Sequence, residues 1–159
     1  MDRYVISGGA PLRGEVRLSG SKNAALAIMA GAILTSDPVI LHNVPRINDI
    51  FIMVAMLRRL GIEADFISPR ALYIDSSHIQ HTDAPEDLVT RMRASFCVAG
   101  PLVTRYGSAR IPLPGGCDIG ARPVDYHNKG LRQLGARVEM RDGYVSIEAS
   151  RLKGTTIYL

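Results

Sequence analysis

Hydrophobic and polar positions repeat along the chain with a period of 74 residues, which divides most of it into two similar units. The segment 57–61 (LRRLG) returns as 131–135 (LRQLG), with apolar residues at helical spacing before each glycine. Each copy is followed by two alternating runs separated by a turn, at 62–75 and 136–148, which predicts a β-hairpin after a helix. The glycine that ends each copy fits the left-handed position just past a helix end.

Each unit also opens with a predicted helix and a short strand. The helices are expected at 23–34 and about 86–105, and the strands at 39–42 and 109–112. The order within a unit is therefore α-β-α-β-β. The sequence predicts an α/β fold made of two such units, over about 22–76 and 86–149.

The ends of the chain differ from the repeated units. Residues 1–21 contain two strand-like runs, 4–7 and 15–18, and residues 155–159 have the pattern of a further strand. The region 22–159 is therefore expected to hold two complete units and the start of a third. Because a repeat that ends on a strand leaves a sheet edge or a helix face uncovered, the sequence predicts a fragment of a larger protein.

Composition and charge narrow the class of protein. The 159 residues are 47% hydrophobic and 21% charged, as in a globular domain, so neither disorder nor a fibrous repeat is indicated. The net charge of +4 favours anionic ligands without implying nucleic acid. The longest apolar run, 24–34, is shorter than the roughly 20 residues of a membrane-spanning helix, and residues 1–4 open no signal peptide. A cytoplasmic protein without a membrane segment is expected.

Residues 19–23 (SGSKN), immediately before the first predicted helix, form a candidate anion site. Ser21 and Asn23 are of types that cap helices, the start of a helix attracts negative charge, and Lys22 adds a full positive charge there. The segment is not a Walker loop, because the four-residue spacer and second glycine of that motif are missing. An ordinary capped helix with a solvated lysine is the alternative.

The segment 113–125 (LPGGCDIGARPVD) is the second candidate. Its glycines surround Cys117 and predict a loop that can carry the thiol toward a ligand, while Pro123 suits the first turn of the next helix. Arg122 is expected to meet an anion, because a lone cation at a helix start is unfavourable. The alternative is a solvent-exposed turn with a chance cysteine.

The two cysteines do not fit the common kinds of cysteine chemistry. They are too few for a disulfide framework and have the wrong spacing for zinc. Cys97, between Phe96 and Val98, is expected in the core. A cysteine hydrolase would need a histidine base near Cys117, and His127, the nearest in sequence, is expected to point elsewhere on its helix. A hydrolase or redox enzyme is therefore disfavoured.

Four blocks of the sequence together carry a family resemblance. They are 19–26 (SGSKNAAL), 92–95 (MRAS), 100–102 (GPL) and 113–125. They resemble the UDP-N-acetylglucosamine 1-carboxyvinyltransferases, a family of enolpyruvyl transferases, and the likeness extends from residue 1 to residue 159. The cysteine in the last block is specific, since the sister family of enolpyruvylshikimate phosphate synthases shares the repeated fold without it. The implied fold is the inside-out α/β barrel of enolpyruvyl transferases, here incomplete.

The resemblance implies transfer of the enolpyruvyl group of phosphoenolpyruvate to the 3-hydroxyl of UDP-N-acetylglucosamine, with release of phosphate, in peptidoglycan precursor synthesis. It implies no metal and no organic cofactor. Lys22 would bind phosphoenolpyruvate, and Arg122 would bind phosphate. Cys117 would donate a proton to the methylene carbon and form covalent adducts, including that of fosfomycin. The residues matched to the UDP-sugar site are Asn23, Arg93, Arg122, Pro123, Val124, Asp125 and Tyr126.

The sequence departs from the family pattern in two respects. Tyr126 stands where leucine is expected, and family members are much longer, with a second domain that supplies the acidic base and further arginines. Residues 1–21 are expected to pair with that missing domain, and the 159-residue chain alone is expected to be inactive. A noncatalytic anion-binding or interaction domain derived from the same fold is the alternative, and a natural stop codon after Leu159 would favour it.

Overall fold

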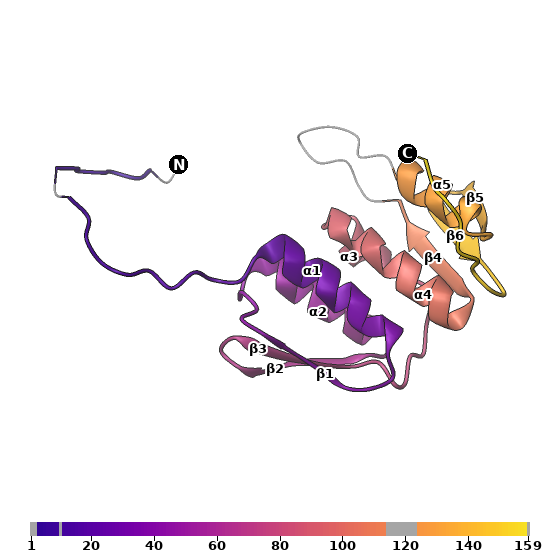
Figure 1. Ribbon diagram of the computed structural model, residues 1–159, viewed down its shortest axis with the longest axis horizontal. Coiled ribbons are helices and arrows are strands. Elements are labelled where there is room, and N and C mark those ends of the chain that lie inside the picture. Colours follow the sequence, from indigo (N-terminus) through magenta and orange to yellow (C-terminus); the bar gives the residue numbers. More distant parts are fainter. Residues whose placement is uncertain (1–2, 10, 114–123, 159) are drawn as a thin grey trace.

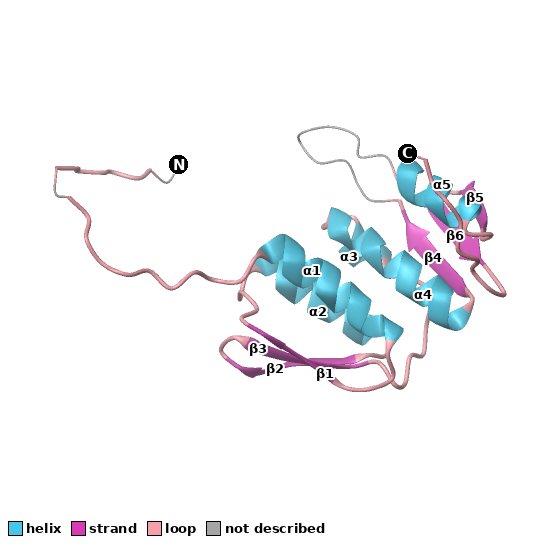
Figure 2. Ribbon diagram, viewed as in Figure 1, coloured by secondary structure: helices cyan, strands magenta, loops and turns pink. Residues whose placement is uncertain are grey.

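The computed structural model describes residues 3–9, 11–113 and 124–158 (Figure 1). Two units follow one another along the chain, each with helices packed against a small sheet (Figure 2). The first unit contains α1 (Lys22–Gly31), the 3-10 helix η1 (Ala32–Leu34), β1 (Val39–His42), α2 (Asn48–Arg59), β2 (Glu63–Ser68) and β3 (Ala71–Asp75). The second contains α3 (Glu86–Val89), the 3-10 helix η2 (Arg93–Val98), α4 (Ala99–Tyr106), β4 (Ser108–Pro112), α5 (Asp125–Gln133), β5 (Arg137–Arg141) and β6 (Tyr144–Glu148).

Both sheets are antiparallel and three-stranded, and in each the last strand in sequence lies in the centre. The orders are β1-β3-β2 and β4-β6-β5. Val39 lies opposite Ile74 in the first sheet, and Ala109 lies opposite Ile147 in the second. Opposite residues project from the same face of a sheet, so each pair helps to form an apolar face for the helices to cover. The predicted α/β fold with a repeated α-β-α-β-β order is confirmed.

The two hairpins close differently. In the second, Asp142 (φ 53°) and Gly143 (φ 80°) form a two-residue turn between β5 and β6, with the two positive φ angles that a type I′ turn requires. In the first, the register between β2 and β3 shifts between Phe66 and Ser68, so the strand bulges before its turn. Both hairpins predicted from the alternating pattern are present.

The helices α2 and α5 end in the same way. After α2, the amide of Gly61 donates to the carbonyl of Arg58 at 3.0 Å. The amide of Ile62 donates to the carbonyl of Leu57, also at 3.0 Å. The equivalent two bonds after α5 are both 2.9 Å long, and Gly61 and Gly135 have φ angles of 91° and 96°. These bonds form the Schellman motif, so the left-handed position predicted for both glycines is confirmed.

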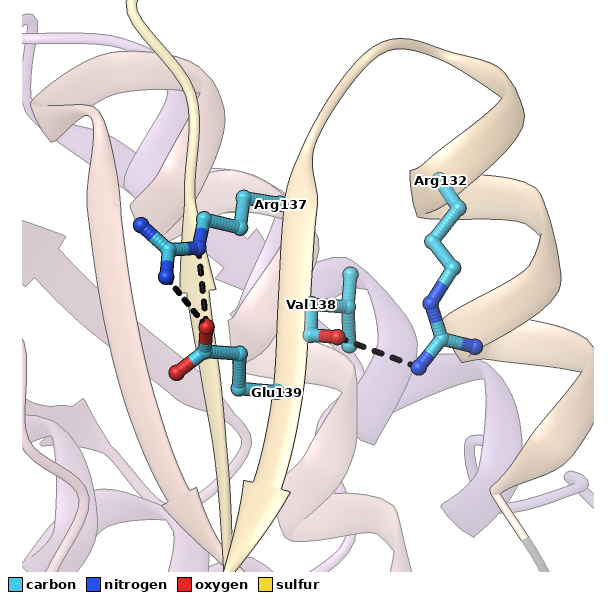
Figure 3. Close-up of polar contacts among 4 residues, drawn as sticks. All are labelled: Arg132, Arg137, Val138 and Glu139. Carbon is cyan, nitrogen blue, oxygen red and sulfur yellow. Dashed lines mark hydrogen bonds and ion pairs between the residues drawn. The ribbon is translucent and has the colours of Figure 1, made fainter.

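An arginine in the last turn of each of these helices binds the strand that follows. Arg58 donates from Nε to the carbonyl of Ala64 at 2.8 Å. Arg132, 74 residues further on, donates from Nη2 to the carbonyl of Val138 at 3.1 Å (Figure 3). The same side chain thus ties helix to strand in both units, and the contact is made to the backbone.

The ion pairs around these arginines are not repeated. Arg58 pairs with Asp65, but the equivalent of Asp65 in the second unit, Glu139, pairs with Arg137 of its own strand (Figure 3). All four side chains are more than half exposed. Ion pairs of this kind contribute little to stability, so the exchange of partners between the units costs little.

One hydrophobic core runs through both units. The helix α4 packs against η1, and η2 packs against α1, so the second unit closes on the helices of the first. The largest fully buried side chains are Met29, Ile33, Ile50, Met53, Met56, Leu57, Leu60, Ile62, Leu72, Ile74, Leu102 and Ile111. Since they come from both units, neither unit buries its apolar surface alone.

The helix predicted over about 86–105 is wrong as a single element. The chain forms α3, η2 and α4 there instead. Met92, between α3 and η2, has an extended backbone (φ −150°, ψ 115°) and a side chain only 6% exposed. Burial of this side chain offsets the helical hydrogen bonds lost at the break. Pro101 falls in the first turn of α4, where a missing N–H is tolerated, so the last helix begins close to it.

Arg105 of α4 joins the second unit to the first. Its Nη1 atom lies 2.8–2.9 Å from four oxygen atoms, namely the carbonyls of Ile33, Thr35 and Ser76 and the hydroxyl of Ser76. The Ser76 side chain is buried and donates in turn to the carbonyl of Thr35 at 2.6 Å. All four acceptors are uncharged. Two of them lie at the end of α1 and η1, where the helix dipole favours a cation.

Residues 3–9 and 11–18 extend away from the two units (Figure 1). Their apolar side chains are exposed, with Tyr4 and Leu12 at 97% and 99%. The structure assigns no strand to these residues or to 149–158, which include the strand-like runs at 4–7 and 15–18 and most of the run at 155–159. Pairing of the first two with a second domain stays a prediction. In the described ranges, no helix is long and apolar enough to cross a membrane.

We expect Arg105→Met to lower the free energy of unfolding by about 2–3 kcal/mol, because it removes a charged donor that four partly buried acceptors share. Arg132→Met is the matched control: it removes one bond, to Val138, from an exposed arginine and should cost about 1 kcal/mol or less. Urea denaturation followed by circular dichroism would measure both. Equal losses in the two variants would contradict the joining role of Arg105.

Candidate anion-binding site

The motif at 19–23 leads into α1 and is capped as the sequence predicts. The backbone of Ser21 is extended, and its hydroxyl accepts a hydrogen bond from the amide of Ala24 at 3.4 Å. The carbonyl of Ser21 accepts another from the amide of Ala25 at 3.0 Å. Lys22 and Asn23 are therefore the first two residues of α1, and both are exposed.

The loop between β1 and α2 contacts this motif at Gly20. A Cβ atom added to Gly20 would lie 1.8 Å from the carbonyl oxygen of Asn43, so the two backbones are in direct contact. Asn43 itself has a positive φ of 58°, a conformation that asparagine tolerates better than most residues. The next amide, of Val44, donates to the carbonyl of Arg70 at 2.9 Å. Backbone contacts thus fix the loop, and the loop in turn limits the position of residue 20.

Lys22 forms an ion pair with Asp49 across this loop. The distance from Nζ of Lys22 to Oδ2 of Asp49 is 2.8 Å, and the two side chains are 47% and 34% exposed. Asp49 lies in the first turn of α2, which packs beside α1. A carboxylate is favourable at a helix start and a lysine is not, so Asp49 also offsets the cost of placing Lys22 there.

Asp49 is the part of this arrangement that sequence reasoning missed. An acidic residue that opens a helix is usually read as a favourable charge for the dipole, and Asn48 and Asp49 have that pattern. Its pairing with Lys22 depends on the packing of α1 beside α2. The available signal was the presence of a lysine and an aspartate, each in the first turn of a predicted helix of the same unit.

The block at 92–95 lies next to α1. Arg93 begins η2, and its side chain is outside the described part of the structure. Because η2 packs against α1, the backbone of this block is brought to the helix that carries Lys22 and Asn23. Ser95, in the same block, is fully buried, and its hydroxyl has no hydrogen-bond partner among the described residues.

Three predicted site residues, Cys117, Arg122 and Pro123, lie in 114–123, outside the described residues. The structure describes what flanks them. Leu113 donates from its amide to the carbonyl of Gly143 at 2.8 Å, and Val124, 3% exposed, packs in the core immediately before α5. Both ends of the cysteine segment are therefore attached to the second unit.

The first turn of α5 holds the remaining predicted residues. Asp125 and Tyr126 are both exposed, Tyr126 to 67%. His127 lies edge-on to Phe96 of η2, with ring centroids 5.4 Å apart at an interplanar angle of 72°. This contact brings the start of α5 to η2, and η2 in turn packs against α1. The described residues of the blocks at 19–26, 92–95 and 113–125 therefore lie on or next to α1, η2 and α5.

The prediction that Cys97 is a core residue is wrong, because its side chain is exposed. Phe96 and Val98, its neighbours, are buried as expected. The segment forms the 3-10 helix η2, in which residues three apart share a face, so Cys97 falls on the same face as the partly exposed Ala94. An apolar run indicated burial, but the phase of the helix decided which side chain faces outward.

Two polar features lie away from these residues. A hollow of about 580 Å³ is lined by Arg59 and the linker residues 80–85. Beside that linker, the hydroxyl of Tyr144 donates to Glu86 at 2.8 Å, and this bond to a carboxylate raises the pKa of Tyr144 above its usual value. Within the described ranges, no three His, Cys, Asp or Glu side chains come together in a way that could hold a metal ion.

The repeated unit and the site point to one class of protein. The family model of EPSP synthase (3-phosphoshikimate 1-carboxyvinyltransferase) matches residues 6–159 of the chain. The chain therefore belongs to the EPSP synthase family, as the α-β-α-β-β repeat and the resemblance of its sequence blocks to enolpyruvyl transferases predict.

Curated relatives define a narrower group. The chain is 50% identical over 159 residues to UDP-N-acetylglucosamine 1-carboxyvinyltransferase 2 of Carboxydothermus hydrogenoformans. It is 46% identical over 157 and 160 residues to the UDP-N-acetylglucosamine 1-carboxyvinyltransferases of Dichelobacter nodosus and Coxiella burnetii. These matches include 99–100% of this chain but only 37–38% of each relative. The chain thus spans well under half the length of the curated relatives that it matches.

Solved structures agree on the fold. The enolpyruvyl transferase NikO from Streptomyces tendae superposes with a TM-score of 0.76 at 28% identity, over 92% of this chain and 32% of that one. EPSP synthase from Acinetobacter baumannii gives a TM-score of 0.61 at 17% identity, over 83% of this chain and 32% of that one. The second similarity concerns the fold alone. Membership of the family and the α/β repeat are therefore supported by sequence and by structure.

We expect Gly20→Ala and Gly31→Ala to have opposite effects. A methyl group at position 20 meets the backbone oxygen of Asn43, which cannot move away as a side chain could, and should cost about 1–3 kcal/mol of stability. Gly31 lies at the end of α1 with open space around it, so alanine there should be neutral or stabilising by up to about 1 kcal/mol. Thermal unfolding of both variants would test this, and a stable Gly20→Ala chain would show that the loop contact is not required.

We expect Cys97 to react with iodoacetamide in the folded chain, since its side chain is exposed. A single-cysteine variant is needed so that the modification can be assigned to Cys97 and not to Cys117. In Cys117→Ala, mass spectrometry of peptides should find Cys97 modified in native buffer as well as in urea. Modification in urea alone would contradict the exposed position of Cys97.

Proposed function

We propose that the chain supplies the amino-terminal part of a UDP-N-acetylglucosamine 1-carboxyvinyltransferase. The proposed reaction transfers the enolpyruvyl group of phosphoenolpyruvate to the 3-hydroxyl of UDP-N-acetylglucosamine and releases phosphate. The observation that carries the proposal is the identity of 46–50% along essentially the whole chain with three relatives of that name. The family model carries the name of an enzyme with a different acceptor, 3-phosphoshikimate. However, the structure of EPSP synthase from Acinetobacter baumannii is only 17% identical to the chain, compared with 46–50% for the three relatives.

Lys22 is the proposed contact for the phosphate of phosphoenolpyruvate. Its ammonium group is about half exposed at the start of α1 and has three N–H donors, of which Asp49 needs one. When the sugar hydroxyl adds to the enol carbon, negative charge is held on a tetrahedral intermediate that carries the phosphate. Fixed cations stabilise that charge, and we assign this role to Lys22 and Arg122.

Cys117 is the proposed acid. It would protonate the methylene carbon as the sugar oxygen bonds to the neighbouring carbon, and phosphate would leave when the proton is returned and the double bond re-forms. The same thiol is the proposed site of covalent adducts, including that of fosfomycin. The attachment of the flanking residues Leu113 and Val124 to the second unit supports this role, since that unit also carries η2 and α5.

The UDP-sugar would bind beside η2, which contacts both α1 and α5, at Asn23, Arg93 and the segment Arg122–Tyr126. Exposure of Asn23, Asp125 and Tyr126 supports side-chain contacts at those positions. Val124 is buried, so any contact of this residue with ligand would be made through its backbone. Tyr126, where leucine is expected, would change the lining of the sugar site and leave the reacting atoms unaffected.

Besides the remainder of the third unit, the enzyme would have a second domain. We propose that it supplies the acidic base for the sugar hydroxyl and further arginines, and that the exposed apolar residues of 3–18, such as Tyr4 and Val16, pair with it. The whole protein would act in the cytoplasm in peptidoglycan precursor synthesis, and thus in the maintenance of cell shape and in cell division.

We expect the 159-residue chain alone to release no phosphate from phosphoenolpyruvate and UDP-N-acetylglucosamine. Loss of a single electrostatic donor can cost about 3 kcal/mol of transition-state stabilisation, and several would be missing. Addition of the remaining part of the Carboxydothermus hydrogenoformans relative as a separate polypeptide should restore release, and Cys117→Ala should abolish it. Shikimate 3-phosphate in place of the UDP-sugar is the control for the acceptor.

Three outcomes would contradict the proposal. Turnover by the chain alone, lost in Cys117→Ala, would show that this part carries a complete mechanism. Turnover with shikimate 3-phosphate instead of the UDP-sugar would assign a different acceptor. Ligand binding without turnover, in a reconstituted complex of proven stoichiometry, would favour a noncatalytic anion-binding domain of the same fold.

A further inference from the structure

We infer that Asp49 is a positioning residue for Lys22: its carboxylate holds the lysine ammonium at the start of α1 so that two N–H donors remain for a phosphate group. This inference rests on the proposed function, in which Lys22 binds phosphoenolpyruvate. The observation behind it is the 2.8 Å contact between Nζ of Lys22 and Oδ2 of Asp49, which joins the first turns of α1 and α2.

The backbone that carries Asp49 is held independently of the lysine. Asp49 lies in the first turn of α2, where the helix dipole favours negative charge. The loop that leads into α2 is fixed by backbone contacts, from Val44 to Arg70 and from Asn43 to Gly20. The backbone of Asp49 therefore stays in place whether or not Lys22 contacts its side chain, and this short side chain keeps the carboxylate near the start of α2.

The lysine, in contrast, needs a partner. A cation in the first turn of a helix is repelled by the dipole, and the four-carbon side chain of lysine has many rotamers. Some described ion pairs join two residues that both lie on helices or strands. Among these, the pair of Lys22 with Asp49 is the least exposed to solvent. Its members are 47% and 34% exposed, against 52% and 58% for Arg58 with Asp65. A contact that is partly shielded from water restrains the side chain more effectively.

Asp49 acts on an anion in two opposing ways. Restraint of Lys22 lowers the entropy lost when the ligand binds, whereas the negative charge of Asp49 repels the ligand. Lys22 stands between the two charges, and water and salt screen the repulsion at an exposed site. Restraint should therefore prevail, and a neutral residue at position 49 should weaken binding by about three- to tenfold, the range for immobilising one flexible side chain.

The test measures the affinity of the 159-residue chain for phosphoenolpyruvate by NMR titration. Asp49→Asn, similar in size to the native residue, is compared with Asp65→Asn, which removes the same charge from the Arg58 pair of the same unit. Asp49→Asn should bind about three- to tenfold more weakly than Asp65→Asn. Asp49→Glu should recover part of the affinity. The ¹⁵N order parameter of the Lys22 ammonium should fall in Asp49→Asn alone.

The same comparison in a Lys22→Met background separates positioning from a general structural effect. Asp49→Asn should not weaken binding there, because the residue through which Asp49 acts is gone. Equal weakening with and without Lys22, or an Asp49→Asn chain that binds as tightly as Asp65→Asn, would overturn the inference while leaving the proposed function intact. If Lys22→Met binds as well as the unmodified chain, the proposed role of Lys22 fails, and the inference fails with it.

Discussion

The arrangement of the two units depends on one guanidinium group. Arg105 reaches from α4 to the end of η1 and to Ser76, where the chain leaves the first sheet. A fixed relation between α4 and η1 helps to define the packing of η2 against α1, where apolar side chains of both elements join the core, because apolar contacts are less directional than hydrogen bonds. The sequence blocks at 19–23 and 92–95 are thus brought together by an interaction that involves neither block.

The repeat shows which contacts the fold requires and which it does not. Both units keep the Schellman ends of α2 and α5 and the arginine that binds the next strand through a carbonyl. Backbone partners are the same whatever the sequence, so these contacts survive divergence between the units. The surface ion pairs have changed partners: Arg137 pairs with Glu139 of its own strand (Figure 3), whereas Arg58 pairs with Asp65 of the strand after its helix. Chemistry specific to one unit, such as the pair of Lys22 with Asp49, has been added to this common frame.

Local features were predictable from the sequence and nonlocal ones were not. The hairpins and the helix-ending glycines follow from turn and cap preferences that act over a few residues. The break at Met92 and the exposure of Cys97 depend on which side chains of this segment pack into the core that distant elements form. An apolar run alone does not indicate this. At the site, the capping by Ser21 was predictable, whereas Asp49 becomes a partner of Lys22 only through the packing of two helices. The roles of Cys117, Arg122 and Pro123 rest on the family resemblance.

The contact between Gly20 and Asn43 has a consequence for how this region can evolve. Most packing conflicts between two positions can be relieved by a smaller side chain at the second position. Here the opposing atom is a carbonyl oxygen, which every residue at position 43 would carry. Substitutions at position 20 should therefore have no suppressor at position 43, and the two sites should show no compensating exchange among homologues. Covariation between sequences would therefore miss this contact.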